Sequence, residues 1–224
     1  MTKPARKIPL NYRNITGYVH SEKSDAYTYF ESSLERDALY LCEFDPDVVS
    51  FSTQPRRFHY TLNGKDRHYT PDIFIEYRSG LKQYVEVKYR EDLKKNWATL
   101  KPKFKAVIHE TKSEPNTKFK ILTECEIRTD YLKNAAFLLP YKHKPYEAYQ
   151  LAMIEKVLSR GLPMTINDLL GICTTDPFEE RAQFIHALWC GIANQKVQID
   201  LHSPLSMDQE VWLNDALFEG EMDE

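Results

Sequence analysis

Two apolar segments joined by a glycine-containing turn constrain the fold more than any other part of the sequence. The segments are DIFIEY at residues 72–77 and QYVEVKY at residues 83–89, and both alternate as strands do. Side chains alternate between the two faces of a strand, so Glu86 and Lys88 share one face while the valines share the other. In a hairpin of these strands, residues whose numbers sum to about 159 lie opposite each other, which brings Asp72 across from Glu86 and Lys88.

Two carboxylates and an ammonium group thus converge inside a sheet, where uncompensated burial of charge is costly. A divalent cation would relieve that cost, because Mg²⁺ prefers hard oxygen ligands, and we expect Mn²⁺ to substitute for it. In this interpretation Asp72 and Glu86 hold the metal, which polarises a scissile phosphate and lowers the pKa of a bound water. Lys88 orients that water and stabilises charge in the transition state.

The pattern of Asp after Pro followed by Glu-x-Lys also arises by chance. The plain alternative is an Asp at the start of a strand and a cross-strand Glu–Lys pair worth a few tenths of a kcal/mol. A third carboxylate would favour the catalytic interpretation, and residues 27–44 offer one because they read as an amphipathic helix. Glu35 lies near the centre of the apolar stripe of that helix, and Glu31, one turn earlier, is the competing candidate.

The other patterns predict an α/β fold in the first part of the chain. The Asn63–Gly64 pair predicts a tight hairpin turn. Strands are expected at 48–51, 57–62 and 119–123, and helices at 93–110 and 131–138. We expect a mixed sheet flanked by helices at residues 1–142, of which 1–25 form a basic arm. A proline-containing basic segment at 138–146 marks the boundary.

Residues 143–224 are predicted to form a second, acidic domain. Helices are expected at 147–160, 165–171 and 179–193, followed by a short strand pair near 197–201 and 211–212. This order resembles a winged helix. Residues 1–145 hold 26 Lys and Arg against 19 Asp and Glu, whereas residues 146–224 hold 4 against 14. The first part could therefore face nucleic acid, which would repel the second part, and a chance imbalance of solvated faces is the alternative.

The densest cluster of positive charge lies in the predicted helix at 93–110, and we expect it to contact the DNA backbone; a solvated helix face is the alternative. Its members are Lys94, Lys95, Lys101, Lys103 and Lys105. The chain has no N-terminal signal pattern and no apolar run near the roughly 18 residues that span a bilayer. Its four cysteines form no CxxC pair. These features predict a cytoplasmic protein with no membrane partner, associated with the nucleoid when active.

The order of several motifs resembles the TnsA family, the endonuclease subunits of heteromeric transposases of the Tn-seven type. The motifs are FESSLERDALYLCEFDPDVVSFSTQP, YTPDIFI, YVEVK and KILTECEI, and the resemblance covers roughly residues 27–140 well and the rest loosely. The resemblance implies a restriction endonuclease-like fold and a metal-dependent nuclease that cuts the 5′ ends of the transposon. It assigns Glu35, Asp72 and Lys88 to the active site. The type member has glutamine where Glu86 stands. Gln54 of the QP motif is interpreted as a structural residue that ends the strand beside the site.

The resemblance also implies partners. They are the transposon-end DNA, a DDE-type transposase (TnsB-like) that processes the 3′ ends, and an AAA+ ATPase (TnsC-like) that binds the C-terminal domain. Two alternatives remain open from the residues alone. One is a stand-alone restriction or repair nuclease of the same fold, and the other is a non-catalytic assembly subunit.

Overall fold

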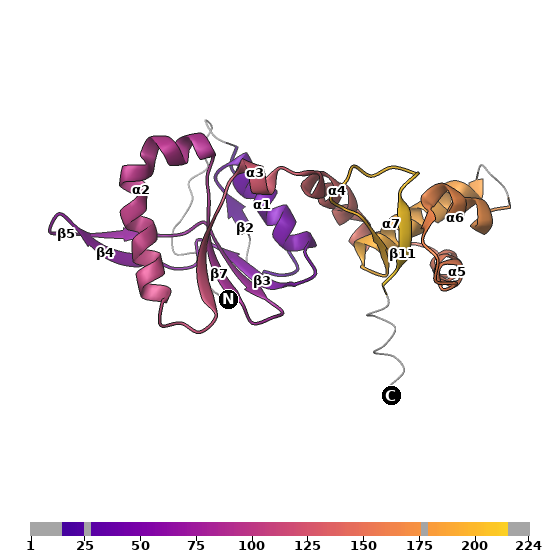
Figure 1. The fold of residues 1–224 in the computed structure, drawn as a ribbon, viewed down its shortest axis with the longest axis horizontal. Helices are drawn as coiled ribbons and strands as arrows, with labels where there is room; N and C mark the ends of the chain where they lie inside the picture. Colours follow the sequence, from indigo (N-terminus) through magenta and orange to yellow (C-terminus); the bar gives the residue numbers. More distant parts are fainter. Residues whose placement is uncertain (1–14, 25–27, 176–178, 215–224) are drawn as a thin grey trace. The chain divides into compact units, whose positions relative to one another are not determined.

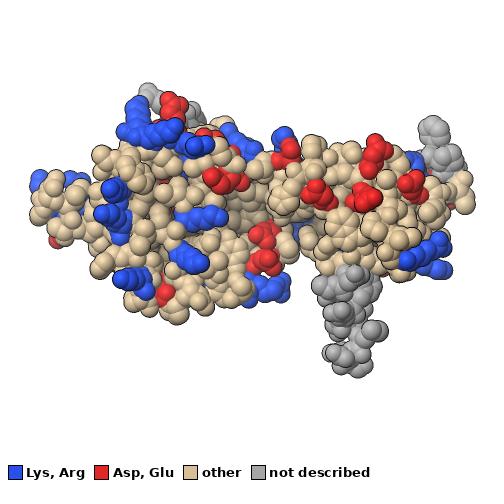
Figure 2. Space-filling model, in the orientation of Figure 1, with Lys and Arg blue, Asp and Glu red and all other residues tan. Residues whose placement is uncertain are grey.

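The computed structural model describes residues 15–24, 28–175 and 179–214, and it divides the chain into two compact units, Met1–Arg128 and Thr129–Glu224. Figure 1 shows the helices and strands of both units. The first unit has 23 Lys and Arg against 18 Asp and Glu, and the second has 7 against 15, so the charge asymmetry follows the units. Figure 2 shows the lysine and arginine side chains spread over the first unit.

A four-stranded mixed sheet forms the centre of the first unit. Its order is β3-β6-β7-β8, and β7 and β8 run parallel while the other neighbours run antiparallel. The strands are β3 (Val48–Thr53), β6 (Ile73–Tyr77), β7 (Lys82–Val87) and β8 (Thr117–Leu122). The remaining elements of this unit are β1 (Gly17–Val19), β2 (Thr28–Phe30), α1 (Ser33–Phe44), β4 (Phe58–Leu62), β5 (Lys65–Tyr69), α2 (Arg90–Thr111) and α3 (Glu124–Ile127). The expected mixed α/β architecture of a restriction endonuclease-like fold is confirmed.

The hairpin of β6 and β7 has the predicted pairing. Ile73 lies opposite Val85 and Phe74 lies opposite Tyr84, within one residue of the expected register. Gly80 supplies the positive φ of 79° that the turn between the strands requires. The same register places Asp72, the residue before β6, across from Glu86.

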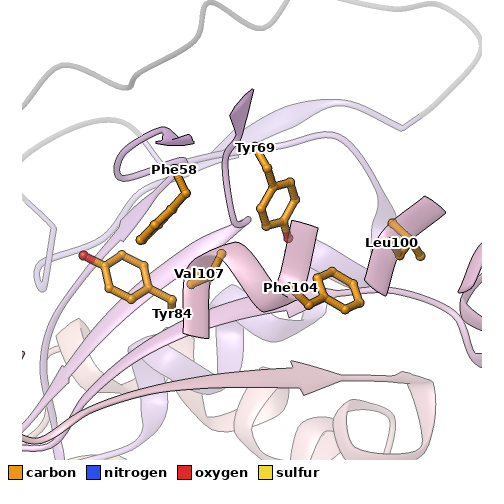
Figure 3. Close-up of a cluster of buried hydrophobic side chains, with 6 residues drawn as sticks. All are labelled: Phe58, Tyr69, Tyr84, Leu100, Phe104 and Val107. Atoms are coloured by element: carbon orange, nitrogen blue, oxygen red, sulfur yellow. The ribbon is translucent and has the colours of Figure 1, made fainter. Parts of the chain in front are cut away.

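Helices cover both faces of the sheet. Glu86 lies on the face opposite Val85 and Val87, as expected, and the residue is only 2% exposed. The reason is that α2 packs over the face that carries Tyr84, where Phe104 and Val107 contribute to an aromatic-rich cluster (Figure 3). Val85 and Val87 on the other face are buried as well, and α1 packs against the sheet.

The segment expected to be one helix at 27–44 is in fact a strand followed by a helix. Thr28–Phe30 forms β2, which pairs with β1, so part of the expected basic arm also lies in a strand. Helix α1 begins only after Ser32, whose hydroxyl accepts a hydrogen bond from the backbone N–H of Glu35 at 3.1 Å. This N-cap satisfies one of the free amides at the helix start, and it leaves Glu31 outside the helix. Residues 1–14 of the expected arm lie outside the described residues.

The turn at Asn63–Gly64 joins β4 and β5 into a separate two-stranded ribbon, as predicted. Both turn residues have positive φ, 53° and 67°, which a tight hairpin turn requires. Phe58 pairs with Tyr69 at the base of the ribbon, and both side chains pack against α2. In Figure 1 the ribbon extends beyond α2 and away from the central sheet.

The second unit combines helices with a small antiparallel sheet of order β10-β11-β9. Helix α6 (Ile166–Cys173) begins after Thr165, where a helix start was predicted. The Thr165 hydroxyl accepts a hydrogen bond from the Asp168 N–H at 3.1 Å and caps the helix. Three helices and a strand pair were expected, and the third strand, β9, was not. Its elements are α4 (Asp130–Leu138), the 3₁₀ turn η1 (Leu139–His143), α5 (Ala148–Leu158), β9 (Met164–Thr165), α6 (Ile166–Cys173), α7 (Glu179–Ala193), β10 (Val197–Ile199) and β11 (Glu210–Leu213). The winged-helix interpretation stays a prediction.

The division between the units falls after Arg128, ahead of the predicted boundary at 142/143. Helix α4 and the turn that follows belong with the second unit because they pack on α7, where Phe137 meets Trp189 edge-to-face at 5.4 Å between ring centroids. No helix in the described part of the chain is long and apolar enough to cross a membrane.

Candidate active site

Asp72 is fixed at the start of β6 by contacts to two neighbouring strands. Its carboxylate Oδ2 accepts a hydrogen bond from the backbone N–H of Val87 at 2.7 Å. Its carbonyl accepts another from the backbone N–H of Gln54 at 2.8 Å. Pro71 precedes it and holds the chain extended there. The second carboxylate oxygen of Asp72 has no hydrogen-bond partner among the described residues, so it is available to a ligand.

Glu86 is buried in β7 and is held through both carboxylate oxygens. The Tyr69 hydroxyl donates a short hydrogen bond to Oε2, and the Lys88 ammonium donates one to Oε1 at 3.1 Å. Burial, together with the nearby carboxylates of Glu86 and Asp72, raises the pKa of the Tyr69 hydroxyl. The tyrosine therefore remains a donor at any physiological pH.

Lys88 lies just beyond β7, and its backbone N–H donates to the Leu122 carbonyl at 3.0 Å. Its side chain is 33% exposed, so the ammonium reaches toward solvent while it contacts buried Glu86. Burial lowers the pKa of Lys88, but the charges of Glu86, Asp72 and Glu35 outweigh it, and the net shift is upward. Lys88 is thus a permanent cation, suited to stabilising negative charge rather than to acting as a base.

Glu35 has both a structural and an electrostatic relationship to the site. Its carboxylate accepts the backbone N–H of Glu31 at 2.8 Å and the hydroxyl of Ser32 at 3.0 Å, so it helps to cap α1. Burial raises the pKa of Glu35, with a smaller contribution from Glu31 and an opposing one from Lys88. Glu35 lines the same cavity as Val87 and Lys88, so α1 brings this carboxylate close to the end of β7, and its charge adds to the raised pKa of Asp72.

An open cavity of about 420 Å³ lies between the start of α1 and the end of β7. Glu31, Glu35 and Lys88 line it, together with Asp92 at the start of α2. Asp72 and Glu86 are not among the lining residues. The structure therefore places both competing glutamates and the lysine at one opening, next to the two deeper carboxylates.

The carboxylates repel one another in the absence of a cation. Burial raises the pKa of Asp72 well above its usual range, and the charges of Glu86 and Glu35 raise it further. A divalent cation would reverse this penalty, and the free oxygen of Asp72 is a hard donor of the kind that Mg²⁺ accepts. The donor chemistry at Asp72 thus fits the predicted metal.

The three predicted ligands do not form a ready-made cage. Across the described part of the chain, no three or more His, Cys, Asp or Glu side chains are arranged to hold one metal ion. Mg²⁺ often uses only one or two carboxylates, with waters and substrate phosphates completing its shell. Asp72 with Glu86 is the pair that fits such a site, and Glu35 as a direct ligand stays a prediction.

Gln54 shows strain beside the site. Its φ is 49°, a left-handed conformation that costs a residue other than glycine roughly 1–2 kcal/mol. Its side-chain oxygen Oε1 is buried and has no hydrogen-bond partner in the described structure. The hydrogen bond from the Gln54 N–H to the Asp72 carbonyl supports the predicted structural role of Gln54 at the end of the strand next to the site.

The predicted DNA-contact lysines all lie on α2. Four of them, Lys94, Lys95, Lys101 and Lys105, are exposed. Lys103 is half-buried, and its ammonium lies 5.8 Å from the centre of the Tyr69 ring. Their role in binding DNA stays a prediction.

Sequence reasoning missed Tyr69, the direct partner of Glu86. It ends β5, whose other four residues are exposed, and precedes Thr70–Pro71, so periodicity gives no sign that its hydroxyl enters the site. The available signal was its place as the first apolar residue before the Pro–Asp pair.

Comparison with protein families decides the identity of the first unit. Residues 45–124 match the family described as "TnsA-like endonuclease N terminal". The chain carries a TnsA-like endonuclease domain. The resemblance to the TnsA family seen in the sequence is thereby confirmed. A comparison with curated proteins gives no match.

The TnsA-like match contains Asp72, Glu86 and Lys88, whereas Glu35 lies ahead of it. The family match supports a nuclease of Tn-seven-type transposases. The geometry adds that the matched segment carries the hairpin whose charged residues converge, and that α1, outside the match, supplies the additional carboxylate.

Proposed function

We propose that this TnsA-like chain is a Mg²⁺-dependent DNA endonuclease subunit of a transposase complex. It hydrolyses a phosphodiester at each 5′ end of the transposon, on the strand that is not transferred. The observation that carries the proposal is the convergence of Asp72, Glu86 and Lys88 within a TnsA-like endonuclease match. A purely structural Glu–Lys pair would not require a neighbouring Asp whose pKa is raised by burial and by the charges of Glu86 and Glu35.

Each residue has a defined task in this proposal. Asp72 and Glu86 would hold the cation, and the chemistry that Mg²⁺ supplies when bound is polarisation of the phosphate and a lower pKa for a bound water. Lys88, a permanent cation at the opening, stabilises the charge that develops on the phosphate and orients the attacking water. Glu35 contributes negative charge from α1, and its hydrogen bonds to the helix start fix its position.

The wider assembly follows from the family and from the charge of the units. A basic first unit suits the DNA backbone, whereas the second unit, with 7 Lys and Arg against 15 Asp and Glu, suits a protein partner. We propose that this partner is a TnsC-like AAA+ ATPase, and that a TnsB-like DDE transposase processes the 3′ ends and supplies sequence specificity. Genes for both partners should lie beside the gene for this chain.

The test is 5′-end cleavage in the reconstituted complex on DNA that carries both transposon ends. Wild type should cut in Mg²⁺ or Mn²⁺ and not in EDTA, and Asp72→Ala should abolish 5′ cleavage while 3′-end processing by the partner continues. Cleavage that persists in EDTA would overturn the metal dependence. Efficient cutting of naked DNA by the purified chain alone would favour the stand-alone nuclease instead.

A further inference from the structure

We propose that the β4–β5 ribbon is a DNA-contact arm that inserts one face into a groove of the duplex beside the active site. This inference rests on the proposed function, because it takes DNA as the substrate, and it assigns a surface other than the lysines of α2. The surface is the Tyr60 face of the ribbon, made up of Tyr60, Leu62, Lys65 and Arg67.

The register of the ribbon defines this face. Tyr60 pairs with Arg67, and Leu62 pairs with Lys65, so the four side chains lie on one side. Lys65 and Arg67 are exposed, and neither side chain forms an ion pair or hydrogen bond within the described residues. The only acid of the two strands, Asp66, lies on the opposite face, where Thr61 donates to it at 3.0 Å.

The face joins the core at the base of the ribbon, where Tyr60 packs against the cluster on α2, so its exposed part is the outer end with Lys65 and Arg67. Phe58 and Tyr69, two residues further toward the base on each strand, lie on the same side of the ribbon. Both are buried in the cluster that packs on α2 (Figure 3). The Tyr69 hydroxyl donates a hydrogen bond to Glu86. A duplex that contacts Arg67 and Lys65 would therefore be held by the same strand that leads into the catalytic carboxylates.

The ribbon has the form of a preorganised reader. Its tight turn at Asn63–Gly64 needs no ordering on binding, and the backbone N–H of His59 donates to the Glu110 carboxylate of α2 at 2.9 Å, which anchors the base. Five residues per strand give a length of about 17 Å. A two-stranded ribbon fits a major groove about 12 Å wide, and two exposed cations at its outer end suit phosphates and base edges.

Exposed charge on a short edge strand also prevents edge-to-edge pairing of sheets, and this is the competing explanation of Lys65 and Arg67. The two explanations differ in what the cations do. Edge protection predicts that their loss promotes self-association without a specific change in DNA binding. A DNA arm predicts a loss of phosphate contacts.

The experiment measures binding of the full chain to labelled duplex DNA in EDTA, from about 50 to about 200 mM salt. K65A/R67A should reduce the slope of log affinity against log salt by about 2. When salt falls from about 200 to about 50 mM, the DNA affinity of wild type should therefore rise roughly tenfold more than that of the variant. The matched control is K118A/K120A, which removes two exposed cations of β8 and should change the slope less than half as much.

Each other outcome overturns the inference. Equal slopes for wild type and K65A/R67A, equal changes in both double variants, or self-association of K65A/R67A with unaltered DNA binding would each contradict it. Absence of duplex binding by wild type at the lowest salt would contradict this inference alone, whereas absence of metal-dependent 5′-end cleavage in the reconstituted complex would contradict the proposed function, so the two failures are distinguishable. K65Q/R67Q serves as a second variant if thermal unfolding shows that the alanine variant is destabilised.

Discussion

The Tyr69 hydroxyl donates a hydrogen bond to Oε2 of Glu86, and the Lys88 ammonium donates one to Oε1 of the same carboxylate at 3.1 Å. Tyr69 comes from the ribbon, and Glu86 comes from the central sheet. Glu86 is 2% exposed, so neither oxygen could be satisfied by bulk water in this position. Tyr69 therefore fixes the orientation of the carboxylate that we propose as a metal ligand.

Tyr69→Phe should weaken metal binding without unfolding the protein. Partners that orient a metal ligand typically contribute 10–100-fold to metal affinity, so we expect at least a tenfold weaker affinity for Mn²⁺. Titration followed by the paramagnetic resonance of free Mn²⁺ measures this without any cleavage assay. Tyr77→Phe is the matched control, because Tyr77 donates to Gln83 at 3.2 Å on the same sheet, away from the carboxylates. Equal Mn²⁺ affinity in wild type and Tyr69→Phe would refute the positioning role.

Glu35→Gln separates the electrostatic role of Glu35 from its role as a helix cap. Glutamine keeps one accepting oxygen for the Glu31 N–H, and its amide nitrogen can donate to the Ser32 hydroxyl, so stability should change little. The loss of charge beside Asp72 and Lys88 should lower 5′-end cleavage at least about 100-fold if Glu35 takes part in the chemistry.

Two controls accompany that variant. Ser32→Ala removes the N-cap and should cost about 1 kcal/mol of stability while it preserves most cleavage. Glu31→Gln should have the smaller effect on cleavage, because the charge interactions with Asp72 and Lys88 involve Glu35. A larger defect in Glu31→Gln than in Glu35→Gln would reverse the assignment.

Asp72→Asn should stabilise the metal-free protein in a pH-dependent way. Burial and the neighbouring carboxylates raise the pKa of Asp72 in the folded state, so the folded protein binds a proton more tightly than the unfolded chain. Ionisation of Asp72 therefore lowers the stability of the folded protein. This loss is absent below the pKa of Asp72 in the unfolded chain, near 4, and grows as pH rises toward its pKa in the folded protein. Thermal unfolding in EDTA should thus show a higher Tm for the variant at pH 8, and the difference should vanish near pH 4.

The sign of this effect should invert when the cation is present. Saturating Mn²⁺ stabilises only a protein that binds it, so wild type should gain in Tm at pH 8 and Asp72→Asn should not. If wild type is the more stable of the two in EDTA at pH 8, the proposed repulsion among the carboxylates is incorrect.

The β6–β7 hairpin could be predicted from sequence because its information is local. Alternating residues, a glycine at the turn and a proline before Asp72 fix the register to within one residue. The prediction for α1 failed at its start, because Thr28–Phe30 can satisfy a helical period as well as a strand. Pairing with β1, a tertiary interaction, determines the strand.

The burial of Glu86 and the contact from Tyr69 could not be predicted, because they depend on how α2 and the ribbon pack over the sheet. Alternation shows which residues share a face but not which face a helix covers. The unit boundary was displaced for a similar reason. The proline-rich segment is a conspicuous local signal, whereas the packing of Phe137 on Trp189 joins residues distant in sequence.

The most direct test of the central claim is the rate of 5′-end cleavage by Lys88→Ala in the reconstituted complex with Mg²⁺. Lys82→Ala is the matched control, because Lys82 begins the same strand and pairs with Glu76 at 3.2 Å. We predict that Lys88→Ala lowers the cleavage rate by at least about 100-fold while complex assembly and 3′-end processing continue, and that Lys82→Ala cuts as wild type does. Cleavage of the 5′ ends by Lys88→Ala at the rate of the control would contradict the assignment of this site.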